Sequence, residues 1–115
     1  MDKIILTNDA DYMICSMYDE YIRRIKNGSP KEEAKYFGGA EKIQETILQE
    51  WSIYDISETA CQLRTVGFLS IKNGDNILCE SALTTDAIVY MENRFKDKAN
   101  SVLDTLAKLR SIIKP

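Results

Sequence analysis

At Gly67 the spacing of apolar residues changes from a helical to a strand period, and this change constrains the fold more than any other feature of the sequence. Before Gly67, apolar residues recur at spacings of three and four, which indicates a helix with one buried face. After it, segments 68–71 and 77–83 are predicted as strands joined by a turn at 72–75. The turn contains Asn73-Gly74, a pair that favours a tight hairpin. We therefore predict a helix that leads directly into a two-stranded hairpin.

Helical segments also precede this unit. The first is expected to start after an N-cap within 7–9 and to end at Asn27-Gly28, where an αL residue can stop a helix. A short second helix should begin at the capping pattern Ser29-Pro30-Lys31-Glu32 and break at Gly38-Gly39. A third is predicted over 40–51.

The chain ends in a long helical stretch, capped within 84–86 and bent near 98–100. Its apolar stripe is very regular and comprises Ile88, Phe95, Val102, Leu106, Leu109 and Ile113. A helix whose apolar face has no core left to cover usually pairs with a second copy, so we expect this stripe to form a homodimer interface. The alternative is that it folds back over the first helix, whose own stripe also needs cover.

The length of 115 residues and the hydrophobic content of 44% allow one compact core and not two. The protein lacks histidine, the commonest general base and metal ligand. Cys15, Cys61 and Cys79 lie far apart without a Cys-x-x-Cys pair, so we expect small buried residues and neither a zinc site nor a disulfide framework. The sequence thus predicts a single domain that is not an enzyme and binds no metal or cofactor.

The sequence also bears on location and charge. Charged or amide residues interrupt every apolar run before it reaches the roughly 20 residues of a membrane span, and the N-terminus lacks the apolar region of a signal peptide. We expect a cytoplasmic protein without a membrane partner. With 15 basic and 18 acidic residues the net charge is −3, so attraction to nucleic acid would depend on local placement of cations.

One ordered pattern resembles a known family. It consists of Leu63-x-x-x-Gly67-Phe68-Leu69, a hairpin, and Leu83-Thr84-Thr85-x-Ala87-x-x-Tyr90-Met91-Glu92. This order resembles the winged-helix family, and it is most similar to small winged-helix proteins of Gram-positive bacteria and their phages, including the YjcQ type. The resemblance covers residues 29–95. It implies a mainly helical α+β chain, a winged helix-turn-helix over 1–83 with a long C-terminal helical extension over 84–115.

The resemblance implies a transcriptional regulator of bacterial or phage origin that binds double-stranded DNA as a dimer. In that family the helix before the hairpin lies in the major groove, while the hairpin, called the wing, contacts phosphates. The residues that match these positions, together with two lysines on the second helix, are Gln62, Arg64, Thr65, Lys72, Asn73, Lys31 and Lys35. Glutamine and arginine are suited to adenine and guanine edges respectively.

The charge of this region favours an alternative. Segment 52–83 carries two cations, Arg64 and Lys72, against four carboxylates, and a phosphate-facing surface normally has the opposite balance. The alternative is a winged-helix module for protein–protein interaction, an adaptor or inhibitor of a host protein that does not bind DNA. A continuous positive strip around Gln62, Arg64 and Lys72 would favour DNA, and a neutral or negative one would favour a protein partner.

Overall fold

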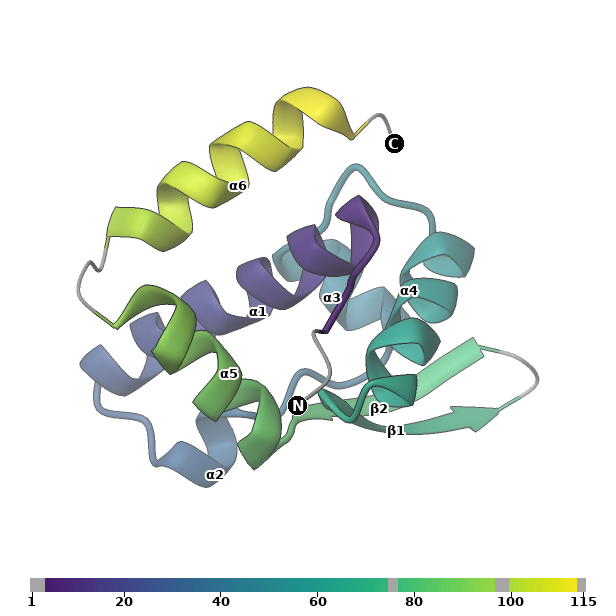
Figure 1. Ribbon diagram of the computed structural model, residues 1–115. Coiled ribbons are helices and arrows are strands. Elements are labelled where there is room, and N and C mark those ends of the chain that lie inside the picture. Colours follow the sequence, from purple (N-terminus) through teal and green to yellow (C-terminus); the bar gives the residue numbers. More distant parts are fainter. Residues whose placement is uncertain (1–3, 75–76, 97–99, 114–115) are drawn as a thin grey trace.

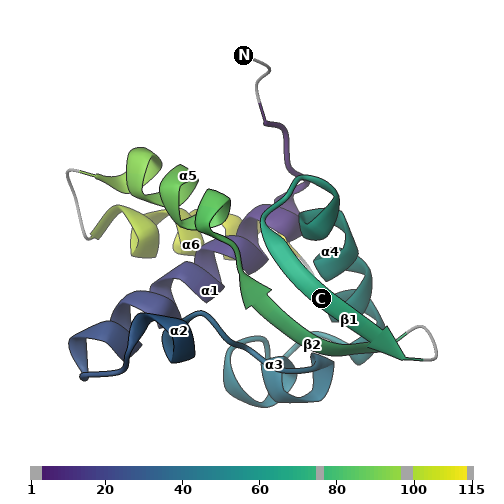
Figure 2. The same cartoon turned by 90° about the horizontal axis from the view of Figure 1, so that it is seen from below.

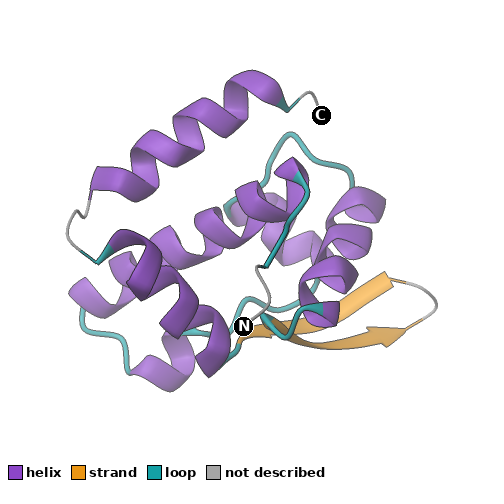
Figure 3. Ribbon diagram, in the orientation of Figure 1, coloured by secondary structure: helices purple, strands orange, loops and turns teal. Residues whose placement is uncertain are grey.

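The computed structural model describes residues 4–74, 77–96 and 100–113, and helices dominate it (Figure 3). The elements, in chain order, are α1 (Asn8–Lys26), α2 (Lys31–Ala34), α3 (Ala40–Thr46), α4 (Ile53–Thr65), β1 (Leu69–Gly74), β2 (Ile77–Leu83), α5 (Thr85–Phe95) and α6 (Asn100–Ile112). The two strands form an antiparallel hairpin. The predicted fold class, mainly helical with a small hairpin and a C-terminal helical extension, is confirmed. Among the described residues, none of the helices has both the length and the apolar character of a membrane span.

Helix α1 occupies the centre of the molecule, between α6 on one side and α4 with the hairpin on the other (Figure 1). It begins where expected, because the Thr7 hydroxyl accepts a hydrogen bond from the Ala10 N–H at 3.1 Å. It ends before Asn27, and the positive φ of Gly28 turns the chain away. Met13, Ile14 and other side chains of its midsection are fully buried, so the core is built around this helix.

Helices α2 and α3 are shorter than predicted. Pro30 precedes α2 without a side-chain cap, so the capping box expected at Ser29 does not form. Helix α3 ends at Thr46, five residues before the predicted end, and the segment that follows is a turn. The turn allows Trp51 to stack on Tyr12, with ring centroids 6.1 Å apart. Burial of this large aromatic side chain therefore overrides the helical spacing of the sequence.

Helix α4 follows α3 and leads directly into the hairpin. The Ser52 hydroxyl accepts from the Asp55 N–H at 3.1 Å and caps the start of α4. Gly67, at φ 86°, ends it, and the Phe68 N–H bonds back to the Leu63 carbonyl at 2.9 Å. The hairpin then begins at Leu69, which pairs with Leu83. This order, a helix that leads directly into a two-stranded hairpin, is the one predicted from the sequence.

The position of the hairpin turn differs from the prediction. Asn73 and Gly74 pair with Leu78 and Ile77 as part of the ladder, so the turn expected at 72–75 is wrong for its described residues. An irregularity of register between Lys72 and Asn73 accompanies this shift. The register buries Leu78 and lets its N–H donate to the Ser57 hydroxyl of α4 at 3.1 Å. Packing against α4 thus decides the register.

The outer edge of β2 is covered by the segment between α2 and α3 (Figure 2). The Phe37 N–H donates to the Ser81 carbonyl and the Leu83 N–H donates to the Lys35 carbonyl, both at 2.9 Å. A Cβ on Gly39 would lie 2.9 Å from the Cys79 carbonyl oxygen, so the close approach of the two segments requires glycine there. These contacts hold the hairpin in a fixed position beside α4.

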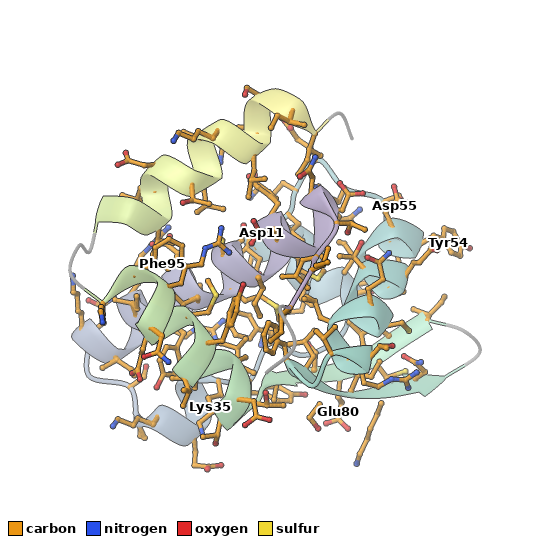
Figure 4. The ribbon with its side chains drawn as sticks, in the orientation of Figure 1. Asp11, Lys35, Tyr54, Asp55, Glu80 and Phe95 are labelled. Atoms are coloured by element: carbon orange, nitrogen blue, oxygen red, sulfur yellow. The ribbon has the colours of Figure 1, made fainter. Side chains whose placement is uncertain are left out.

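Two helices, rather than one bent helix, form the C-terminal extension, although residues 97–99 at the predicted bend lie outside the described residues. Helix α5 is tied to α1 by a two-point ion pair, in which Arg94 Nη1 and Nη2 lie 2.5 and 3.0 Å from the Asp11 carboxylate oxygens. Next to it, Phe95 stacks on Tyr18 with centroids 6.5 Å apart. Asp11 and Phe95 are labelled in Figure 4.

The apolar stripe of this extension is covered within the chain, which corrects the expected dimer interface. Val102, Leu106 and Leu109 are at most 8% exposed and belong to the core, and α6 packs along α1. Ile88, Phe95 and Ile113 are half-buried against the same core. Because α5 and α6 are separate helices, α6 can run back over α1, as the alternative interpretation required. Dimer formation itself remains a prediction, but this stripe is not available as the interface.

The cysteines only partly follow the expectation of buried residues. Cys15 is fully buried, Cys61 is half-buried and Cys79 is exposed. Burial, and then the neighbouring Asp11 carboxylate, raise the pKa of the Cys15 thiol to about 12. Its Sγ donates to Asp11 Oδ1 at 3.6 Å. Cys15 therefore stays a neutral core residue over the physiological pH range.

Thr84 links the end of the hairpin to α5, and its replacement should destabilise the protein. Its hydroxyl accepts from the Ala87 N–H at 3.1 Å and donates to the Gly67 carbonyl at 2.7 Å. We expect Thr84→Ala to lower the free energy of unfolding by about 1–2 kcal/mol, measured by urea denaturation. The matched control Thr85→Ala removes an exposed hydroxyl one residue later and should change it by less than about 0.5 kcal/mol. Equal effects of the two changes would refute the capping role of Thr84.

Candidate macromolecule-binding surface

Helix α4 presents one face to the core and the opposite face to solvent. Ile56, Ala60 and Leu63 are fully buried, and they recur at the spacing of one helical face. On the hairpin side, Ser57 is also buried through its bond to Leu78. The exposed residues of α4 that lie opposite this buried set are Tyr54, Asp55, Glu58, Gln62 and Thr65. We call these five residues the outer face of α4.

The outer face of α4 combines an aromatic side chain with negative charge. Tyr54 is 73% exposed, which is unusual for a large aromatic residue, and it points away from the body of the protein together with Asp55 (Figure 4). Glu58 lies one turn further along the same face. The outer face thus has two carboxylates and no cation.

The three α4 residues predicted to contact DNA do not form one patch. Gln62 and Arg64 are two positions apart, about 200° around the helix axis, so they lie on opposite flanks. Gln62 accepts a hydrogen bond from the Thr7 hydroxyl at 2.9 Å, and the Thr65 hydroxyl donates to the Cys61 carbonyl at 3.0 Å. Arg64 is exposed and has no ion pair with any residue that the structure describes.

The two hairpin residues predicted to contact DNA, Lys72 and Asn73, interact instead with neighbouring residues of the hairpin and of α4. Lys72 Nζ lies 3.5 Å from Glu80 Oε2 on the paired strand, so its charge is largely balanced. Glu80 also accepts a hydrogen bond from the Tyr36 hydroxyl at 3.2 Å. The pKa of Tyr36 is raised, mainly by loss of hydration and to a smaller extent by the negative charge of Glu80. Asn73 Nδ2 lies 3.9 Å from Cys61 Sγ. The wing therefore offers little free positive charge to a phosphate.

Lys31 and Lys35 lie apart from the other predicted DNA contacts. They belong to α2 and its C-cap, at the end of the molecule opposite the hairpin tip in two perpendicular views (Figures 1 and 2). Lys35 Nζ is 4.0 Å from Glu32 Oε1, whereas Lys31 is exposed. The structure thus does not bring these lysines together with Arg64 and Lys72 into a continuous positive strip.

Sequence reasoning missed the two residues that distinguish this surface. Tyr54 lies exposed on the outer face, and its spacing of four from Glu58 is the sequence signal that could have placed it there. The neutralisation of Lys72 by Glu80 depends on the hairpin register, which the sequence pattern did not give. Together these residues make the surface aromatic and negative rather than positive.

Two further observations bear on the chemistry of the protein. Within the described ranges, histidine, cysteine, aspartate and glutamate side chains do not gather in groups of three that could hold a metal ion. No protein-family model, curated protein or solved structure is significantly similar to this chain. The likeness to the winged-helix family therefore stays a prediction, and function must be argued from the surface itself.

Proposed function

We propose that this chain is a winged helix-turn-helix module that binds a partner protein through the outer face of α4. The observation that supports it is the exposed Tyr54 flanked by Asp55 and Glu58, with no cation on that face. Exposed tyrosines are enriched among residues that dominate the energy of protein interfaces. A phosphate backbone, in contrast, is repelled by two carboxylates at the position where a recognition helix would meet it.

The charges also define the partner. A complementary surface has an apolar pocket that accepts Tyr54, with lysine or arginine side chains at its rim to pair with Asp55 and Glu58. The role is that of an adaptor or inhibitor of a host protein in the cytoplasm, without catalysis, metal or cofactor.

Truncation of Tyr54 tests this proposal. We expect Tyr54→Ala to weaken partner binding by roughly 30-fold or more, because a central aromatic contributes about 2 kcal/mol or more. The immobilised full chain is incubated with nuclease-treated cell extract, and the affinity of the retained protein is then measured by titration. The matched control Val89→Ala removes a 48%-exposed apolar side chain from α5 and should not change the affinity. A partner that binds Tyr54→Ala as tightly as the unchanged protein would rule this face out.

A second candidate function is the binding of duplex DNA by a transcriptional regulator. It is supported by the arrangement of α3, α4 and the wing, which leaves α4 accessible, and by the exposed Arg64 and Lys31. The α6 stripe is not proposed as the dimer interface of such a regulator, because it is covered by α1. The charge of the outer face of α4 makes DNA the weaker of the two candidates.

A further inference from the structure

A groove with a volume of about 440 Å³ lies where α6 ends, next to the segment that leads into α4. It is bounded by the end of α6, the first turns of α1 and the turn that connects α3 to α4. Its volume falls within the range of small-molecule sites. The groove is not part of the surface that we propose binds a protein.

The groove is lined by both polar and apolar atoms, and much of its apolar part comes from aromatic and aliphatic side chains. Tyr12 and Trp51 are two of its lining residues; their rings stack with an interplanar angle of 16°, and both side chains are mostly buried. Ile47 and Ile113 contribute half-buried side chains from opposite elements, the α3–α4 turn and the end of α6. A small hydrocarbon ring that contacts these four side chains is therefore removed from water.

Arg110 supplies the one cation of the groove among the lining residues that the structure describes. Its Nε and Nη2 donate to the Tyr12 hydroxyl oxygen at 3.2 and 3.0 Å, which fixes one edge of the guanidinium. The end fork, formed by Nη1 and the second N–H of Nη2, has no hydrogen bond to a described residue. This fork has the geometry that binds a carboxylate through two parallel hydrogen bonds.

Glu50 at the rim restricts which anion can bind. It lies close enough to Arg110 to raise the pKa of the guanidinium, after the larger effect of Tyr12, yet no ion pair between the two is formed within 4.0 Å. The fork of Arg110 is thus left for a ligand, while the Glu50 charge repels a second negative group. The arrangement selects a singly charged acid over a dianion.

We propose that this groove binds a small monocarboxylic acid with an apolar ring. The carboxylate pairs with the Arg110 fork, and the ring lies between Ile47 and Ile113 against Tyr12 and Trp51. Because α6 and the α3–α4 turn both line the groove, the ligand joins the C-terminal helix to the start of α4 and stabilises the packing of α6.

Trp51 is the only tryptophan of the chain, so its fluorescence reports directly on the groove. Benzoate titrated into the full-length protein should change the Trp51 emission in a saturable way, with a dissociation constant of about 0.1–10 mM for a ligand of this size. Benzamide has the same ring without the charge, and phthalate adds a second carboxylate. Both should bind at least roughly tenfold more weakly than benzoate.

Three substitutions complete the test. Arg110→Gln should weaken benzoate binding roughly tenfold or more, whereas the control Arg64→Gln removes an exposed arginine from α4 and should leave it unchanged. Glu50→Gln should improve the binding of phthalate, and thermal melts verify that each variant is folded. The proposal is overturned if benzoate gives no saturable change, if benzamide binds equally well, or if Arg110→Gln binds benzoate like the unchanged protein. None of these outcomes bears on the Tyr54 surface.

Discussion

Leu106→Asp is expected to lower the free energy of unfolding by about 3–5 kcal/mol, the largest loss among the changes proposed for α6. Leu106 is 8% exposed, and it packs in the core that α6 shares with α1. A charged carboxylate at this position either loses its hydration or forces α6 away from α1. Urea denaturation followed by Trp51 fluorescence measures the loss, and sedimentation at several concentrations measures the mass.

Leu103→Asp is the matched control, because it makes the same change three residues earlier on the same helix. Leu103 is 53% exposed, so the free energy of unfolding should change by less than about 0.5 kcal/mol. If α6 instead served as a dimer interface, the unchanged protein would sediment as a dimer and Leu106→Asp would yield a stable monomer. That result would contradict the intramolecular packing of α6.

Reversal of the two carboxylates on α4 is expected to create DNA binding. The double substitution Asp55→Lys with Glu58→Lys replaces repulsion by attraction at the face that a duplex would meet in a winged-helix complex. We expect the variant to bind random duplex DNA at low salt with a dissociation constant of about 1–100 μM, in the range of non-specific complexes. Two added phosphate contacts should give a slope of about −2 when the logarithm of affinity is plotted against the logarithm of salt concentration.

A control with the same net charge separates local placement from global attraction. Glu92→Lys with Asp104→Lys changes two exposed carboxylates on α5 and α6, away from the outer face of α4. This control should bind the duplex far more weakly than the α4 variant, as measured by fluorescence anisotropy of a labelled duplex. Equal binding by both variants would mean that net charge, and not the geometry of α4, governs the interaction.

The elements that the sequence predicted well are those set by local chemistry. The ends of α1 and α4 follow from the hydroxyls of Thr7 and Ser52 and from Gly28 and Gly67, whose effects act within a few residues. The hairpin register and the path of α6 follow instead from contacts between distant segments. Leu78 meets Ser57, and Leu106 meets α1, neither of which a periodic pattern can specify.

The candidate surface could be predicted only in part, for the same reason. Periodicity identified α4 and its solvent-facing side, and the excess of carboxylates was visible in the composition of 52–83. The ion pair of Lys72 with Glu80 could not be predicted without the strand pairing that places the two side chains together. The hydrogen bond of Gln62 with Thr7, a residue 55 positions away, could not be predicted either. Long-range contacts thus decide which polar groups remain available to a partner.

We propose that the outer face of α4 binds a protein and not a phosphate backbone. A titration of the unchanged full-length chain into labelled duplex DNA at about 50 mM salt, followed by anisotropy, tests it most directly. We predict no binding up to about 100 μM protein, where non-specific complexes of DNA-binding proteins already form. Saturable binding that weakens steeply with added salt, and that is lost with Arg64→Gln, would contradict the claim and establish DNA as the partner.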